Sequence, residues 1–230
     1  MNNQETNKIV LETTLAFPSP QTLDEALASL GLEFSAEQIE RLDRYRAALW
    51  KWNERLNLTR HTDLEKFAHR DVYDAMMLER LLGPGEDVLD VGTGGGVPGV
   101  ILAIARPDLS VTLSESVAKK AKAVAAIVGE LDLPVAVEHA RAESLLETRR
   151  FDSLVARGVA PLHRILTWFE PRWDAIGQLF LIKGKNWTAE RSDARSRGLL
   201  RDLELRRLTT YTTPRTDNIS VILRVSPKED

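Results

Sequence analysis

The sequence predicts an α/β protein with a mainly parallel, seven-stranded sheet that ends in an antiparallel hairpin and follows an N-terminal helical cap. From residue 87 onward, short apolar runs alternate with helical patterns, which is typical of βαβ units. Two strand-like runs near the C-terminus are separated by only five residues, which suits a hairpin and is too short for a crossover. Before residue 83, apolar residues recur at helical spacing.

The first 82 residues divide into a tail and a cap. Residues 1–21 are polar and include Pro18 and Pro20, so we expect a flexible tail there. Residues 22–82 are expected to form the helical cap, with one helix over 63–81. Two capping-box patterns mark earlier helix starts, at Thr22 with Glu25 and at Ser35 with Gln38.

The remaining chain, residues 83–230, is expected to form a cofactor-binding domain. It begins after a Gly-Pro-Gly break at residues 83–85. Strands are expected at 87–91, 110–114, 134–138, 151–156, 177–183, 207–213 and 219–225. Helices are expected at 98–105, 117–131, 141–147 and 161–172.

A glycine-rich turn within residues 87–99 is the most informative part of the chain. The segment reads DVLDVGTGGGVPG, an apolar run followed by five glycines within eight residues. Glycines allow a sharp turn and a close approach of a ligand to the backbone. Pro98 then opens a helix, whose first N–H groups have no partner within the helix. The turn therefore predicts a ligand site at a helix N-terminus.

Two cofactors fit this turn. Residues 94–99 have the G-x-G-x-x-G spacing of a nicotinamide dinucleotide site, and residues 90–96 have the D-x-G-x-G-x-G form found in S-adenosylmethionine enzymes. Glu115 comes 19 residues after Gly96, where an acid suits the two hydroxyl donors of a ribose in either cofactor. The terminal hairpin favours the second cofactor, because it is the architecture of class I methyltransferases. A glycine turn without any ligand is a third interpretation.

Composition limits the class of protein. The 230 residues are 43% hydrophobic with a formal charge of −3, which suits one ordinary domain plus an extension. No apolar run reaches the length of a membrane span and no signal pattern opens the chain, so we expect a cytoplasmic protein without a membrane partner. The chain has no cysteine, and its four histidines lack ligand spacing, so no metal site is expected.

Charge is distributed unevenly along the chain. Residues 183–207 carry eight Lys and Arg against four Asp and Glu, and basic residues also outnumber acidic ones in residues 51–70. Each stretch is either a solvated face or part of a surface for nucleic acid.

Two motifs resemble a known family. Residues 51–59 read KWNERLNLT, which is similar to the family string K-W-N-x-x-x-N-L-T, and residues 90–99 are similar to its D-V-G-T-G-x-G-x-P-G. Over roughly residues 35–225 the chain resembles the small-subunit ribosomal RNA guanine-N7 methyltransferase G family, also called glucose-inhibited division protein B. It departs from the family at Asp71 and Ala75, where histidine and serine are usual, and also at Val97 and Gly158.

The resemblance implies S-adenosylmethionine as the cofactor and assigns residues to it. Glu115 would accept hydrogen bonds from the ribose, and Ala142 and Glu143 would lie beside the adenine. The implied cofactor residues are Asp90, Gly92, Gly94, Gly96, Val97, Glu115, Ala142, Glu143 and Arg157. The plainer alternatives are a surface acid at Glu115 and a helix-start acid at Glu143.

The resemblance also implies a target, N7 of a guanine in 16S ribosomal RNA, free or within the small subunit. Arg157 would be the catalytic residue where donor and substrate meet, unless it only pairs with a surface acid. The implied substrate residues are Arg55, Arg70, Lys183 and Lys185, and further RNA candidates are Arg60, Lys66, Trp187 and Arg191. Trp52 and Asn53 are expected to pack the cap onto the domain. Guanine N7 carries no proton, so no general base is required.

Other interpretations keep the fold and change the function. The same fold and cofactor would serve a methyltransferase for another RNA or for a small molecule. A binding protein that keeps the cofactor and lacks turnover is the non-enzymatic alternative. We expect a monomer.

Overall fold

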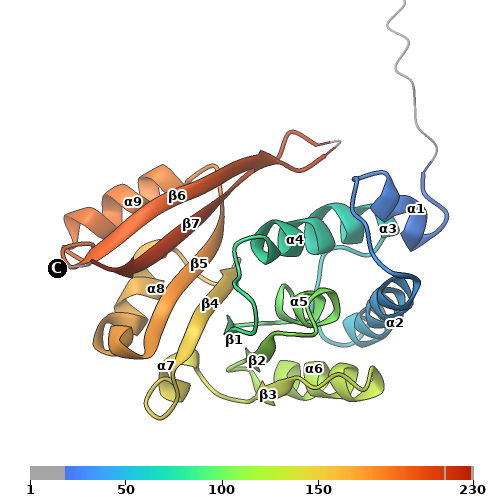
Figure 1. Cartoon of the computed structure of the whole chain (residues 1–230), viewed down its shortest axis with the longest axis horizontal. Helices are drawn as coiled ribbons and strands as arrows, with labels where there is room; N and C mark the ends of the chain where they lie inside the picture. Colours follow the sequence, from blue (N-terminus) through green and yellow to red (C-terminus); the bar gives the residue numbers. More distant parts are fainter. Residues whose placement is uncertain (1–18, 215, 229–230) are drawn as a thin grey trace, which may run out of the picture.

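The computed structural model describes residues 19–214 and 216–228. Most of the expected tail lies outside the described residues. The described chain forms a seven-stranded sheet with helices on both faces, and the cap helices lie beyond one face (Figure 1).

The sheet has the predicted mixed character. Its strands are β1 (Asp87–Val91), β2 (Ser110–Ser114), β3 (Ala136–Glu138), β4 (Phe151–Arg157), β5 (Ile176–Gly184), β6 (Leu203–Thr212) and β7 (Ile219–Pro227). The order is β3-β2-β1-β4-β5-β7-β6, with β1 to β5 parallel and β7 antiparallel to both neighbours. A dinucleotide fold has a sixth parallel strand beside the fifth. The inserted β7 therefore confirms the prediction of a terminal hairpin.

Helices cover the sheet largely where they were expected. They are α5 (Gly99–Ala105), α6 (Ala118–Glu130), α7 (Ala142–Leu145), α8 (Leu162–Phe169) with a 3₁₀ turn η2 (Glu170–Ala175), and α9 (Trp187–Ser196). The sequence did not predict α9, because only Ala194 of this helix is buried and so no apolar stripe marks it. The β6 strand also begins four residues before its predicted start at 207, at Leu203.

The cap is helical, as predicted. It comprises α1 (Leu23–Ala28), α2 (Ala36–Asn53), α3 (Leu64–Lys66), a π-helical turn η1 (Phe67–Val72) and α4 (Tyr73–Glu79). Both predicted capping boxes are present, at Thr22 with Glu25 and at Ser35 with Gln38. The expected helix over 63–81 is interrupted by the wider π turn, a feature that is frequent at functional sites.

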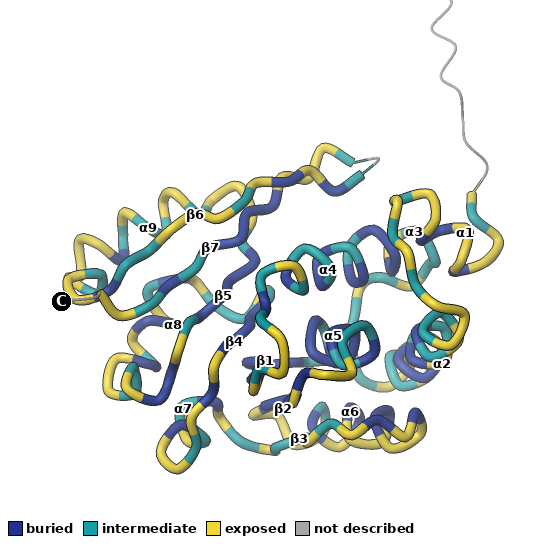
Figure 2. Tube along the Cα trace, in the orientation of Figure 1, coloured by how far each residue is buried: buried dark blue, intermediate teal, exposed yellow. Residues whose placement is uncertain are grey.

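Two apolar cores lie on opposite faces of the sheet. Successive residues of β1 alternate between them, since Val88 joins the core with the cap, α5 and α6, whereas Leu89 joins the core with α8 and the β7 side. Figure 2 shows the buried trace running through the central strands and along one side of α2 and α4. The cap therefore shares a continuous core with the sheet, which fixes its position over the glycine turn.

Two further findings concern the described part of the chain. None of its helices is both long and apolar enough to cross a membrane. It also brings together no group of three His, Asp or Glu side chains suited to a metal ion.

Candidate functional site

The glycine turn joins the end of β1 to the start of α5. Three of its glycines have positive φ angles, 64° at Gly92, 60° at Gly94 and 106° at Gly96. Residues that carry a Cβ rarely adopt these φ angles, so glycine is required for the path of this turn. At Gly99, a Cβ would lie 2.2 Å from the Leu113 side chain, so the start of α5 packs directly against β2.

Asp90 lies beneath the turn and is fully buried. Its Oδ2 accepts hydrogen bonds from Thr93 Oγ1 at 2.6 Å and from the Gly99 N–H at 2.9 Å. Burial raises the pKa of this carboxyl to about 6, against 3.8 ordinarily, although both hydrogen bonds oppose the shift. Asp90 therefore holds the two ends of the turn together, and its second oxygen, Oδ1, has no hydrogen-bond partner among the described residues.

The cap supports the turn from its other side. The Tyr45 hydroxyl of α2 donates to the Gly95 carbonyl at 3.0 Å, and a Cβ on Gly95 would lie 2.7 Å from the Leu49 side chain. Asn53 accepts from the N–H groups of Leu58 and Thr59 at 2.7 and 2.9 Å, which folds the end of the KWNERLNLT segment over the turn. The Asn53 contacts lie within the cap, so they shape the cap itself, and the expected packing of Asn53 onto the domain stays a prediction.

Glu115 stands at the end of β2, beside the turn. Its Oε2 accepts from the Gly94 N–H at 3.1 Å and its Oε1 from the Val117 N–H at 2.8 Å. The residue is only 6% exposed, so it is not a loose surface acid. Each carboxylate oxygen has a second lone pair, and the side chain also lines a cavity.

Two adjoining cavities follow the carboxyl ends of β1, β2 and β4. The larger measures about 340 Å³ and is lined by Gly92, Gly94, Val97, Glu115, Lys120, Arg157, Gly158 and, from the cap, Leu58 and Thr59, among others. The smaller measures about 70 Å³ and includes Ala142 and Glu143. Gly92, Ser116 and Val159 line both cavities, so they form one groove.

The groove collects most of the residues predicted to bind the cofactor. Gly92, Gly94, Val97, Glu115 and Arg157 line its larger part, whereas Ala142 and Glu143 line the smaller. Asp90 and Gly96 line neither part. Asp90 lies beneath the turn, and Gly96 belongs to the turn but packs against Val100, so both support the groove without lining it.

Arg157 ends β4 and joins the sheet to the cap. Its Nη2 lies 2.5 Å from Asp71 Oδ1, and its Nη1 lies 3.2 Å from Asp74 Oδ2 and donates to the Arg70 carbonyl at 2.7 Å. Both carboxylates are buried, whereas the Arg157 side chain is 19% exposed. Its neighbouring acids belong to the cap and are buried, so a pairing with a surface acid is excluded.

The network around Arg157 extends in two further directions. Asp71 Oδ1 also lies 2.8 Å from His61 Nδ1, and Asp74 Oδ1 accepts from the Tyr211 hydroxyl of β6 at 2.7 Å. Burial raises the pKa of Asp74, and the positive charge of Arg157 opposes the shift. The network thus connects β4, the cap and the β6–β7 hairpin at one point.

Besides the groove, a separate cavity of about 380 Å³ lies on the other side of Arg157 and Gly158. These two residues line both this cavity and the groove. We call it the target cavity. Its further lining residues include Arg70, Asp74, Lys183, Lys185, Asp217, Asn218 and Ser220. Lys183 is held by the Ala160 carbonyl at 2.6 Å and by Glu190 at 2.8 Å, whereas Lys185 is exposed.

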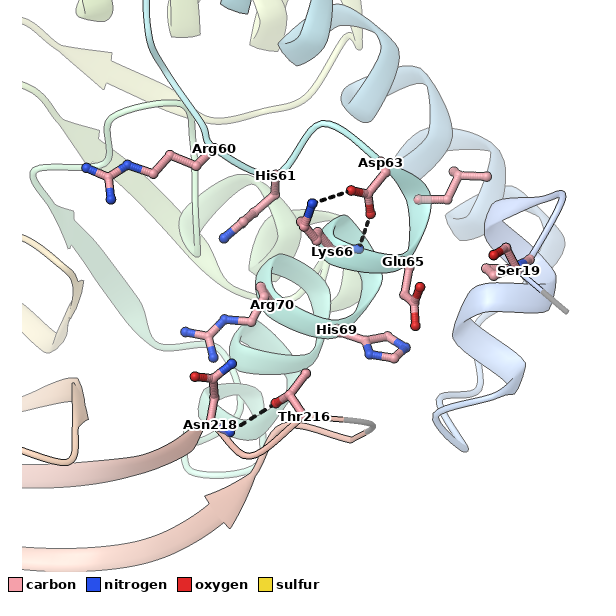
Figure 3. A pocket seen from close by; sticks show the side chains of 12 residues that line it. Ser19, Arg60, His61, Asp63, Glu65, Lys66, His69, Arg70, Thr216 and Asn218 are labelled. Carbon is pink, nitrogen blue, oxygen red and sulfur yellow. Dashed lines mark hydrogen bonds and ion pairs between the residues drawn. The ribbon is translucent and has the colours of Figure 1, made fainter. Parts of the chain in front are cut away.

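A third cavity, of about 700 Å³, adjoins the target cavity through Arg70 and Asn218. Figure 3 shows it between the cap and the tip of the β6–β7 hairpin, with Arg70 and Asn218 on one side and Glu65 and His69 on the other. Arg60 and Lys66 also line it, and Lys66 is paired with Asp63 at 2.8 Å.

Three predicted RNA candidates lie away from these cavities. Arg55 is exposed after the end of α2 and lines none of them. Trp187 and Arg191 lie on α9, where the Arg191 guanidinium is 5.1 Å from the centre of the Trp187 ring. The structure therefore separates the basic stretch of residues 183–207 into Lys183 and Lys185 at the target cavity and a distant remainder on α9 and β6.

Sequence reasoning did not assign a role to Asp71 or Asp74. Both acids fall within an otherwise apolar helical pattern, between the buried residues Ala68, Val72 and Ala75. An acid at a buried helix position indicates a partner cation, because an unpaired buried charge is costly. That signal was available in the sequence, although it does not identify Arg157 as the partner.

Comparisons with known proteins agree with this geometry. The sequence profile of the family described as rRNA small subunit methyltransferase G matches residues 38–217. The protein named ribosomal RNA small subunit methyltransferase G from Rhodopirellula baltica is 48% identical over 186 residues, covering 81% of this chain and 80% of that protein. The protein of the same name from an Anaeromyxobacter species is 39% identical over 165 residues, covering 70% and 73%.

Solved structures show the same fold at low sequence identity. A structure of a mutant of MtNAS in complex with S-adenosylmethionine aligns with a TM-score of 0.56 and 16% identity, covering 89% of this chain and 84% of that one. The bifunctional kinase-methyltransferase WbdD aligns with a TM-score of 0.53 and 18% identity, and this chain spans about half of its length, 46%. The fold is that of class I S-adenosylmethionine methyltransferases, as the terminal hairpin predicted.

Proposed function

Because the chain belongs to the rRNA small subunit methyltransferase G family, we propose that it transfers the methyl group of S-adenosylmethionine to N7 of a guanine in 16S ribosomal RNA. The observation that carries this proposal is the junction of two cavities. The groove beside the glycine turn and the target cavity meet at Arg157 and Gly158. A cofactor in one and a base in the other would face each other there.

The groove fits S-adenosylmethionine residue by residue. A buried carboxylate, Glu115, lies on its wall, where it can accept hydrogen bonds from the two ribose hydroxyls. Gly92 and Gly94 line the groove without a Cβ, and so let the backbone approach the ligand. Ala142 and Glu143 line the small recess that we assign to the adenine, and Val97 supplies an apolar contact.

The methyl transfer requires little of the protein beyond the orientation of its two reactants. The sulfonium of bound S-adenosylmethionine supplies an activated methyl group. Guanine N7 presents a lone pair and no proton, so this chain needs no base to activate it. Holding two reactants in line can contribute about 7–11 kcal/mol to lowering a barrier. The side chains at the junction fit this requirement, since Asp71 and Asp74 are committed to Arg157.

Arg157 acts mainly by fixing the junction in this proposal. It anchors η1 and α4 of the cap against the end of β4, and its 19% exposed side chain forms part of both cavity walls. The methylated guanine ring gains a positive charge, which Arg157 alone would repel. Its two partner acids give the cluster a formal charge of −1, from one guanidinium and two carboxylates.

The RNA would enter from the cap and hairpin side. Arg70 and Lys185 line the target cavity, and Arg60 lines the adjoining third cavity, so a strand that passes between them meets cations on both sides. Lys183 lines the target cavity as well, but its ammonium group is held by Glu190. We assign Lys183 to shaping the cavity wall and Lys185 to contact with the RNA.

We also propose a cellular location and an oligomeric state for the protein. Small-subunit ribosomal RNA is found in the cytoplasm of bacteria, so we place the protein there, and we propose that it acts as a monomer. Sedimentation of the purified chain with and without the RNA tests the second statement.

Transfer of radiolabel tests the proposal. The protein is incubated with labelled S-adenosylmethionine and either small or large ribosomal subunits from cells that lack this modification. We expect label in the RNA of small subunits only, and the Glu115→Ala variant should need more cofactor to reach the same rate. Label in another RNA, or cofactor binding without any transfer, would overturn the assignment of the substrate or of the activity, respectively.

A further inference from the structure

A fourth cavity lies far from the junction, between α9 and the start of β6. It measures about 490 Å³, and we call it the α9–β6 groove. Its lining residues are Arg191, Arg195, Gly198, Leu200, Arg201, Leu203, Glu204, Leu205 and Lys228. The α9 helix packs against α8 and buries only Ala194, whereas Arg191 and Arg195 of the same helix line the groove.

The groove is strongly positive in a protein with a formal charge of −3. Four of its lining side chains are cations, against the single carboxylate of Glu204. Glu204 is already paired with Arg206 at 2.6 Å and with Arg224 at 3.2 Å. Among the described residues, no ion pair involves Arg191, Arg195 or Arg201. Cations that lack partner acids favour an anionic ligand.

Two of these cations, Arg191 and Arg195, lie with an aromatic residue in one stripe along α9. Trp187, Arg191 and Arg195 recur every four residues along α9, so they lie on one side of the helix. Arg207 of β6 lies over the Trp187 ring at 5.7 Å, and thereby joins the strand to this stripe. An array of cations along one direction suits a polymer with repeated charges better than a single small anion.

The hairpin connects this groove to the target cavity. The β6 strand begins at Leu203, and Lys228 follows the end of β7; both residues line the groove. At the other end of the hairpin, residues 217–220 line the target cavity. Figure 1 shows β6 as a long strand on the free edge of the sheet, running from α9 to the tip beside the cap. Ten residues of strand span about 33 Å, which is the length of several nucleotides.

We propose that the α9–β6 groove binds the sugar-phosphate backbone of the ribosomal RNA at a distance from the methylated guanine. This inference rests on the proposed function, since it assumes an RNA substrate. The groove would hold phosphates through Arg191, Arg195, Arg201 and Lys228, while the target cavity holds the base. Such contacts carry no sequence information, but they fix the register of a large substrate on the enzyme.

An alternative role for these charges is protection of an edge strand. Exposed arginines on an edge strand prevent pairing with other chains. That role explains Arg206 and Arg207 on β6, but it does not explain Arg195 and Arg201, which lie on α9 and in the following turn. It also predicts no effect of these two arginines on RNA binding.

A pair of matched double variants separates the two roles. The test variant is Arg195→Gln with Arg201→Gln, and the control variant is Arg80→Gln with Lys122→Gln. All four residues are exposed, and each variant lowers the net charge by two. Binding of each protein to 16S ribosomal RNA is measured over a range of salt concentrations, and binding of S-adenosylhomocysteine is measured alongside.

We expect the test variant to bind RNA about ten- to fiftyfold more weakly near 0.1 M salt, with a salt slope smaller by about 1.4–1.8, as for two lost phosphate contacts. The control should keep the wild-type slope, and both variants should keep wild-type affinity for S-adenosylhomocysteine. Equal RNA affinity and slope in the test and control variants would overturn the inference alone. If the wild-type protein neither binds nor methylates small-subunit RNA, the proposed function fails instead.

Discussion

The contact between Arg157 and the two cap acids has a consequence for stability that can be measured. In Arg157→Ala, Asp71 and Asp74 lose this cation, and in the wild-type protein their side chains are only 0% and 1% exposed. Removing one partner of a buried ion pair costs about 3–5 kcal/mol, because the other charge stays buried without compensation. Since the free energy of unfolding of a native protein is about 5–15 kcal/mol, this variant would retain little stability.

The assay is urea unfolding at pH 7, followed by circular dichroism. We expect Arg157→Ala to lose at least about 3 kcal/mol, whereas Arg80→Ala at an exposed site should stay within about 0.5 kcal/mol of the wild type. Neutralising one of the two acids that lose the guanidinium should recover stability, so adding Asp71→Asn to Arg157→Ala should restore about 1 kcal/mol or more. A loss below about 1 kcal/mol in Arg157→Ala would show that the carboxylates are not held by this residue.

Three other predictions concern the cofactor side of the site. Because burial raises the pKa of Asp90 from 3.8 to about 6, the native state binds this proton more tightly than the unfolded chain, and stability falls as pH rises between these values. Asp90→Asn should therefore remove about 2 kcal/mol of that fall between unfolding experiments at pH 4 and pH 7, and an unchanged slope would contradict the assignment. Gly99→Ala should destabilise the protein by about 1–3 kcal/mol, because the added Cβ would meet Leu113. Gly129→Ala, which has open space around it on α6, should be neutral or stabilise the protein by up to about 1 kcal/mol. Thermal unfolding that ranks the two variants in the opposite order would contradict this packing. Glu115→Ala should weaken binding of S-adenosylhomocysteine by about ten- to a hundredfold in calorimetry, and an unchanged affinity would exclude its contact with the ribose.

The sequence predicted most of the fold because its signals are local. β1 and β2 have their predicted bounds, 87–91 and 110–114, since each is a short apolar run flanked by turn residues. The capping boxes at Thr22 and Ser35 depend on contacts within four residues, and both are present. By contrast, α9 was missed because it buries only Ala194 and depends on tertiary packing for its position.

The candidate site also combines features that depend on neighbouring residues with features that depend on residues far apart in the sequence. The glycine turn and Glu115 were predicted as candidate cofactor residues because the signals for a turn and for a strand end lie in consecutive residues. The role of Arg157 was not, because its partners Asp71 and Asp74 lie more than 80 residues earlier and meet it only after the cap folds onto the sheet. The same limit applies to Lys183, whose pairing with Glu190 requires α9 to exist.

The identity of the methylated nucleoside shows whether the protein modifies N7 of guanine. Small subunits labelled by the wild-type protein are stripped of protein, and the RNA is digested to nucleosides and separated by chromatography with mass detection. We expect all of the label in 7-methylguanosine, because N7 needs no base and the carboxylate of Asp74 beside the junction is committed to Arg157 and Tyr211. Label in a different nucleoside, whether at an exocyclic amine or on another base, would contradict it.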